Sequence, residues 1–125
     1  MLKPVSKNFK GITIITGPTK SGKSKLAEFL IKEQRSINYI ATSKPRYNDP
    51  EWQRRINIHR KRRPDSWKTI EHPDNICNVI ESIGGNESIL IDSLGGVVEQ
   101  HLRENDDKWQ LFQCKFIDCL INTNH

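Results

Sequence analysis

The chain has 125 residues, 34% of them apolar, and a net charge of +5, which suits one domain with a modest core. No apolar run approaches the roughly 20 residues of a membrane span, and the basic N-terminus lacks the apolar segment of a secretory signal. Three cysteines without a CxxC pair argue against a disulfide scaffold or a zinc site, so we expect a cytoplasmic protein in which Cys77, Cys114 and Cys119 fill small apolar gaps.

Short β-like runs alternate with amphipathic helical stretches along the chain. Ile- and Thr-rich or turn-bounded apolar runs indicate strands, and apolar residues at three- and four-residue spacing indicate helices. The predicted elements, in chain order, are a buried strand at 11–16, a helix at 24–33, a strand at 37–42, a helix at 50–62, a strand at 68–71, a helix at 76–83, a strand at 88–92 and a final helix from 107. This alternation predicts an α/β domain with a mainly parallel sheet.

The segment from Gly17 to Ser24 matches G-x-x-x-x-G-K-[ST] at every fixed position, between a predicted strand and a predicted helix. Its glycines let amide groups surround phosphate oxygens, and the helix N-terminus adds the positive end of its dipole. We expect Lys23 to act on the β- and γ-phosphates and Ser24 to ligate Mg²⁺. The predicted nucleotide-binding residues of this P-loop are Gly17, Pro18, Thr19, Lys20, Ser21, Gly22, Lys23 and Ser24.

Asp92 ends the apolar run 89–91 and lies at the carboxyl end of a predicted strand. In P-loop folds an acid at this place holds the magnesium ion, directly or through water, so Asp92 is a predicted metal ligand and catalytic residue. The alternative is a strand-end aspartate that caps the following turn. Together with the P-loop, Asp92 predicts a single P-loop NTPase-like nucleotide-binding domain over residues 1–125, with three layers.

His59 lies in the basic half of the chain. Residues 1–68 carry a net charge of +12, from 17 Lys/Arg and 5 Asp/Glu, whereas residues 69–125 carry −7, from 3 Lys/Arg and 10 Asp/Glu. Nearby positive charge lowers the pKa of a histidine, and a neutral imidazole among cations suits a nucleophile that attacks a phosphate. The alternative is a surface histidine on a basic helix that binds nucleic acid. The residues that share its predicted helix face are Trp52, Ile56 and Arg63, and the cations near it are Arg55, Arg60, Lys61, Arg62 and Arg63.

The order of these motifs resembles the bifunctional adenosylcobinamide kinase/adenosylcobinamide-phosphate guanylyltransferase family, over residues 11–102. The resemblance rests on GPTKSGKS, YIAT and LIDSLG and on a specific string that holds Arg55-Ile56, His59-Arg60, Arg63-Pro64, Trp67 and Glu71. The segments 51–53 and 90–95 look most like the cyanobacterial branch, whereas Pro50 and Trp52 replace an acid and a methionine common in the family. Family members continue beyond this length, so the resemblance implies a domain that lacks the C-terminal part of the family fold.

The resemblance implies two reactions in the assembly of the cobalamin nucleotide loop. Adenosylcobinamide is phosphorylated with ATP or GTP, and GMP is then transferred from GTP to adenosylcobinamide phosphate, with Mg²⁺. In the family a histidine carries GMP covalently, and the matching residue is His59. The resemblance also implies a homo-oligomer. The further nucleotide contacts that it implies are Thr42, Ser43, Lys44, Arg60, Lys61, Arg62, Arg63, Glu71 and Asp92.

Two other functions remain open at this stage. One is an unrelated small P-loop kinase, and the other is a non-catalytic nucleotide- or RNA-binding module that uses the basic helix at 51–63. Few aromatic residues interleave with that helix and no RNA-binding motif is present, so we expect no nucleic-acid partner and no membrane span. A covalent adduct specific to GTP would exclude the binding module.

Overall fold

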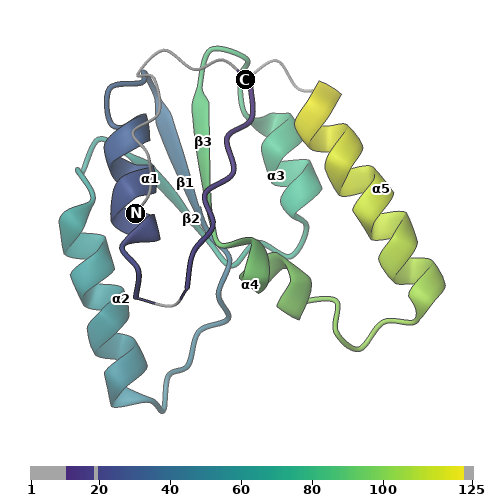
Figure 1. Ribbon diagram of the computed structural model, residues 1–125, viewed down its shortest axis with the longest axis horizontal. Helices are drawn as coiled ribbons and strands as arrows, with labels where there is room; N and C mark the ends of the chain where they lie inside the picture. Colours follow the sequence, from purple (N-terminus) through teal and green to yellow (C-terminus); the bar gives the residue numbers. More distant parts are fainter. Residues whose placement is uncertain (1–10, 19, 123–125) are drawn as a thin grey trace.

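The computed structural model describes residues 11–18 and 20–122 (Figure 1). The helices and strands, in chain order, are α1 (Lys23–Ile31), β1 (Ile37–Ala41), α2 (Pro50–Arg62), β2 (Lys68–Glu71), α3 (Ile76–Ser82), β3 (Ser88–Asp92), α4 (Leu94–Glu99) and α5 (Asp106–Asn122). These elements confirm the predicted α/β class and all four predicted helices. None of the helices in the described part of the chain combines the length and the apolar character that a membrane span requires.

The strands form a parallel sheet in the order β2-β1-β3. Ile40 of β1 lies opposite Ile70 of β2 and Ile91 of β3, so these three apolar side chains share one face. Tyr39, one residue earlier, lies on the other face, as do Asp92 and Glu71 at the carboxyl ends of their strands. The two faces therefore differ, because one is apolar and the other gathers polar groups at the carboxyl end.

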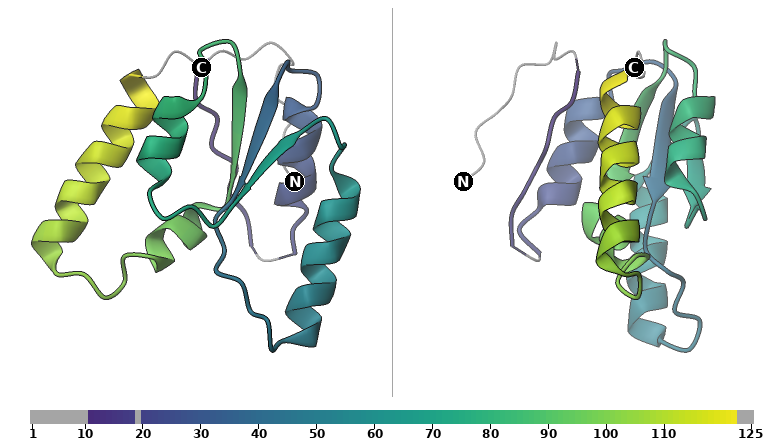
Figure 2. Two further views of the ribbon diagram at one scale, coloured as in Figure 1. Left: turned by 180° about the vertical axis from the view of Figure 1, so that it is seen from behind. Right: turned by 90° about the vertical axis from the view of Figure 1, so that its right-hand side faces the viewer.

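Helices cover both faces of this sheet, and α1 and α3 lie on opposite sides of it (Figure 2). On the apolar face the sheet, α3, α4 and α5 enclose the main core, and the burial of each large apolar side chain there contributes about 1.5–3 kcal/mol. On the other face α1 packs against β3 and buries Leu30 and Ile31. The buried members of the core cluster are Ile40, Ile76, Ile80, Val97 and Cys119.

The prediction of a buried strand at 11–16 is wrong. The segment forms no strand, and Ile12 and Ile14 are 56% and 68% exposed. Figure 2 (right) shows it apart from the sheet, on the outer side of α1. Its Ile and Thr residues favour extended backbone, but a strand also needs hydrogen bonds to a neighbouring backbone, and in the described residues β3 pairs with β1 alone.

The prediction that the cysteines fill apolar gaps is correct for Cys119, which is buried, and wrong for Cys114, which is exposed. Phe112, Phe116 and Cys119 face the core from α5, since they are three or four residues apart and a helical turn takes 3.6 residues. Cys114 does not follow this spacing and therefore points to another side of the helix. Cys77 is partly buried, and its carbonyl oxygen accepts a hydrogen bond from the Cys119 thiol with an Sγ···O distance of 3.5 Å.

Candidate nucleotide and phosphate site

The P-loop closes on itself just before α1. The amide of Ser21 donates to the carbonyl of Pro18 at 3.2 Å, and Gly22 caps the helix with a φ of 88°, in the left-handed region that favours glycine. The Lys23 ammonium group folds back over the loop and donates to the Gly17 carbonyl at 3.0 Å. Lys23 therefore places its charge beside the loop whose amides are suited to bind phosphate.

The remaining P-loop residues sit around this turn. Lys20 is exposed and has a φ of 62°, which sharpens the bend of the loop, whereas Ser24 is partly buried in the first turn of α1. Thr19, which the sequence also assigns to the loop, lies outside the described residues. The parallel strands end on the same side of the molecule as this loop, in the lower half of Figure 1.

Asp92 at the end of β3 accepts a hydrogen bond from the hydroxyl group of Tyr39. Tyr39 is 3% exposed, and burial, followed by the nearby charge of Asp92, raises the pKa of its phenol, so the hydroxyl remains a donor. The Arg63 guanidinium lies over the Tyr39 ring, 4.0 Å from its centroid. Tyr39 thus connects the strand acid to the end of the basic helix, a role that the sequence analysis missed because Tyr39 appeared there only inside the YIAT motif.

Thr42 ties the carboxyl ends of β1 and β3 together. Its hydroxyl donates to the Ser93 carbonyl at 2.6 Å and accepts from the Ser93 amide at 2.8 Å, and its own amide donates to the Asp92 carbonyl at 3.0 Å. Since Thr42 is 1% exposed and its hydroxyl is used twice, it is suited to position the strand ends. Ser43 and Lys44 are exposed in the loop that follows.

His59 lies on the partly buried face of α2 together with Trp52 and Ile56, as predicted. Arg63, predicted for the same face, instead follows the helix as its C-cap with extended backbone. Its Nδ1 atom is 3.3 Å from an Nη atom of Arg62. The pKa of His59 is lowered, first by burial and second by the Arg62 charge, while the Asp92 and Glu28 carboxylates oppose the shift. The predicted direction is confirmed, but burial is its main cause.

Glu28 of α1 holds Arg62 through two hydrogen bonds, at 2.9 Å to Nε and 3.2 Å to Nη2. The Glu28 side chain is only 12% exposed and that of Arg62 27%. The pair joins the helix that follows the P-loop to the helix that carries His59, and the two helices lie side by side in Figures 1 and 2. The sequence analysis missed Glu28, because it gave no reason to pair one acid of α1 with one arginine of α2.

Arg60 and Glu71, both expected to contact nucleotide, form an ion pair with each other. They border a hollow of about 220 Å³ on the same face of the sheet as Tyr39. Trp67 lines this hollow, and the centroid of its ring is 6.4 Å from that of the Tyr39 ring. Lys61, which follows Arg60 in α2, is exposed. The residues that line the hollow are Arg60, Arg63, Pro64, Asp65, Trp67, Thr69 and Glu71.

Asp92 ends β3 and Ser24 lies in the first turn of α1, and each side chain offers an oxygen donor. Within the described residues no group of three or more His, Cys, Asp or Glu side chains is arranged to hold a metal. Mg²⁺ usually takes one or two protein oxygens and completes its shell with water and substrate phosphates. The Asp92 carboxylate and the Ser24 hydroxyl are donors of this kind.

The family model for cobinamide kinase / cobinamide phosphate guanyltransferase matches residues 13–125. The chain belongs to this family. It is 34% identical over 102 residues to the bifunctional adenosylcobalamin biosynthesis protein CobU of Escherichia coli (strain K12). This alignment covers 77% of this chain and 55% of that protein. It is 40% identical over 83 residues to the bifunctional adenosylcobalamin biosynthesis protein CobP of Pseudomonas aeruginosa. This alignment covers 65% of this chain and 47% of that protein. The chain thus spans about half the length of the curated relatives it matches, and no solved structure matches it.

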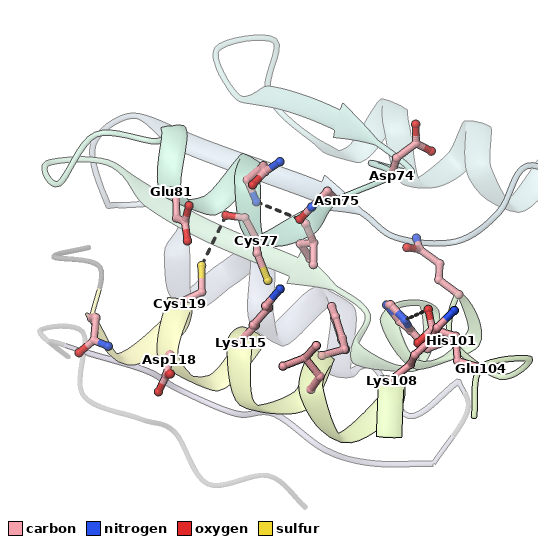
Figure 3. Close-up of a pocket in the computed structure, with 16 residues that line it drawn as sticks. Asp74, Asn75, Cys77, Glu81, His101, Glu104, Lys108, Lys115, Asp118 and Cys119 are labelled. Atoms are coloured by element: carbon pink, nitrogen blue, oxygen red, sulfur yellow. Dashed lines mark hydrogen bonds and ion pairs between the residues drawn. The ribbon is translucent and has the colours of Figure 1, made fainter. Parts of the chain in front are cut away.

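A second hollow of this family member lies away from these residues. It is a groove of about 780 Å³ between α3 and α5, and none of the predicted site residues lines it (Figure 3). Acids and lysines are mixed along its walls, and His101 and Glu104 form an ion pair at one end (Figure 3). The candidate site is therefore the P-loop side, where amides, Lys23 and the arginines of α2 supply groups that bind phosphate.

Proposed function

We propose that this protein acts in the assembly of the cobalamin nucleotide loop. It phosphorylates adenosylcobinamide with ATP or GTP, and it transfers GMP from GTP to adenosylcobinamide phosphate through a covalent intermediate on His59. The observation that carries the proposal is a partly buried histidine of lowered pKa, joined through Arg62 and Glu28 to the helix that begins at the P-loop. The family match and the names of the relatives, which describe bifunctional adenosylcobalamin biosynthesis proteins, support it.

Nucleotide binding follows from the charges around the loop. The amides of the P-loop and the Lys23 ammonium bind the β- and γ-phosphates, and the arginines of α2 stabilise negative charge that develops at the α-phosphate. A bound Mg²⁺, held by Ser24 and Asp92, would neutralise phosphate charge. Tyr39 keeps the Asp92 carboxylate in place by its hydrogen bond.

The transfer itself proceeds in two displacements. A ring nitrogen of neutral His59 forms a bond to the α-phosphorus of GTP, and the bond from that phosphorus to the bridging oxygen of the β-phosphate breaks, so that pyrophosphate leaves with the electron pair. A phosphate oxygen of adenosylcobinamide phosphate then attacks the same phosphorus, and the nitrogen–phosphorus bond breaks to restore the imidazole. The low pKa of His59 favours the neutral ring that the first displacement needs.

The test is the intact mass of the protein after incubation with GTP and Mg²⁺. We expect the mass of GMP to be added, an acid-labile and alkali-stable bond, and little addition from ATP. His59→Asn should abolish the adduct and leave phosphorylation of adenosylcobinamide in place. His101→Asn is the control, because His101 lies beside Glu104 at the groove between α3 and α5, away from the P-loop side, and this variant should still form the adduct.

Two results would contradict this proposal. An adduct that persists in His59→Asn would mean that another residue carries GMP. Wild-type protein that binds GTP and phosphorylates a small molecule without forming any adduct would favour a P-loop kinase of another kind.

We further propose that the protein forms a homo-oligomer. In the described residues one edge of β3 has no strand partner, and an exposed strand edge pairs readily with a second chain. Helix α5 also exposes apolar side chains, with Leu111, Ile117 and Ile121 at 57%, 53% and 66%. Light scattering at tens of micromolar should give a mass of two chains or more, and a single monomeric species would overturn this.

A further inference from the structure

We propose that Arg62 and Glu28 control the nucleophile: Arg62 covers Nδ1 of His59, and Glu28 holds Arg62 there until a nucleotide phosphate draws the guanidinium away. The proposal rests on the proposed transfer of GMP to His59. It assigns Glu28, on the helix after the P-loop, as a positioning residue for that reaction.

The direction of the hydrogen bond between Arg62 and His59 fixes the tautomer of His59. A guanidinium group can only donate, so at 3.3 Å from Arg62 the Nδ1 atom of His59 must accept. A neutral imidazole that accepts at Nδ1 carries its proton on Nε2. The resting protein therefore holds His59 in one tautomer.

Neither ring nitrogen can attack a phosphorus atom in this arrangement. The lone pair of Nδ1 is engaged by Arg62, and Nε2 has no lone pair free while it bears the proton. The contact between Arg62 and His59 must break before a nitrogen–phosphorus bond forms, whichever nitrogen attacks. Arg62 thus restrains the nucleophile as well as lowering its pKa.

Glu28 is the group that holds Arg62 at this position. One carboxylate oxygen accepts from Nε and the other from Nη2, in a two-point pair that is largely screened from water. Neighbouring arginines have other partners, since Arg60 pairs with Glu71 and Arg63 lies on the Tyr39 ring. A phosphate group offers Arg62 the same two-point geometry as Glu28, so nucleotide binding supplies a competing acceptor.

Diethyl pyrocarbonate tests this without nucleotide, because it acylates an imidazole nitrogen that has a free lone pair. The full chain is treated at pH 8, where the ring is neutral in every variant, and acylation of His59 is followed by peptide mass spectrometry. Arg62→Met should speed acylation of His59 by about fivefold, the equivalent of one net hydrogen bond. Glu28→Gln, which keeps the size of the side chain, should give a smaller increase. Glu87→Gln, which breaks the ion pair with Lys68 at 3.0 Å on another part of the sheet, should leave the rate unchanged.

A second readout separates positioning from a merely structural role. If Glu28 competes with phosphate for Arg62, Glu28→Gln lowers the GTP concentration that half-saturates adduct formation. A structural role alone would raise that concentration. Unchanged acylation of His59 in both Arg62→Met and Glu28→Gln would overturn the proposal, and Glu28→Gln decides alone if Arg62→Met does not fold. Faster acylation in a protein that forms no GMP adduct would retain the Arg62 restraint and reject the transfer reaction.

Discussion

Replacing Gly96 with alanine is expected to destabilise the protein by about 2–4 kcal/mol. A Cβ atom at Gly96 would lie 2.2 Å from the Thr42 hydroxyl oxygen and 2.9 Å from the Thr42 carbonyl carbon. The hydroxyl cannot turn away without losing its two hydrogen bonds to Ser93, and the carbonyl carbon can move only with β1. Overpacking of this kind costs about 1–3 kcal/mol, and each lost hydrogen bond adds about 1 kcal/mol.

The neighbouring glycine provides the control. A Cβ at Gly95 would meet its nearest atom, the Ser93 hydroxyl oxygen, at 3.5 Å, an ordinary contact, so Gly95→Ala should be neutral or stabilise α4 by up to about 1 kcal/mol. Urea denaturation measures both variants, and thermal melting should show a fall of roughly 8–16 °C for Gly96→Ala alone. Because the same contact positions Thr42 and Asp92, this variant should also bind GTP more weakly. Equal stability of the two variants would refute the assigned packing of α4 on the strand ends.

Four more predictions concern single side chains. Lys23→Ala should weaken GTP binding in calorimetry by about tenfold or more, since it removes the mobile charge on the phosphates, and Asp92→Asn should raise the Mg²⁺ concentration that activity requires. Because the pKa of His59 lies below 6.5, the unfolded chain takes up this proton first, so stability falls as the pH drops below 6.5, and His59→Asn should flatten that part of a denaturation profile. Iodoacetamide should label exposed Cys114 at pH 8 well before Cys119, because burial raises the pKa of the Cys119 thiol to about 11. Peptide mapping would show the order of labelling.

Local sequence signals predicted most of the secondary structure, and the exceptions have a physical cause. The Asp49 cap, with Pro50 after it, defined the start of α2 because these signals act within one turn, and the Asp49 side chain indeed accepts from the Trp52 amide. The segment 94–99 gave no such signal, since it holds two glycines, yet it forms α4 through burial of Gly96 and Val97 in the core. The predicted strand at 11–16 failed for the opposite reason: its composition favours a strand, but within the described residues no neighbouring strand pairs with it.

The candidate site shows the same division between local and distant information. A motif such as the P-loop can be predicted because its function depends on backbone turns and one lysine within eight residues. Glu28 and Tyr39 could not be predicted, because each acts through a partner that lies 34 or 53 residues further along the chain. Such pairings depend on how α1 and α2 pack and on the register between β1 and β3.

The basic helix α2 illustrates why charge alone predicts so little about mechanism. The sequence presents its C-terminal arginines as one cluster around His59, whereas the fold gives them separate partners: a strand acid for Arg60, Glu28 and His59 for Arg62, and an aromatic ring for Arg63. An arginine that already holds a carboxylate must exchange that partner for a phosphate, so its contribution to nucleotide affinity is a difference between two ion pairs. A nucleotide can therefore move these side chains as it binds, and Arg62 is the arginine with a hydrogen bond to the proposed nucleophile in the described structure. The order in which partners are exchanged, rather than the total charge of α2, would decide when His59 becomes reactive.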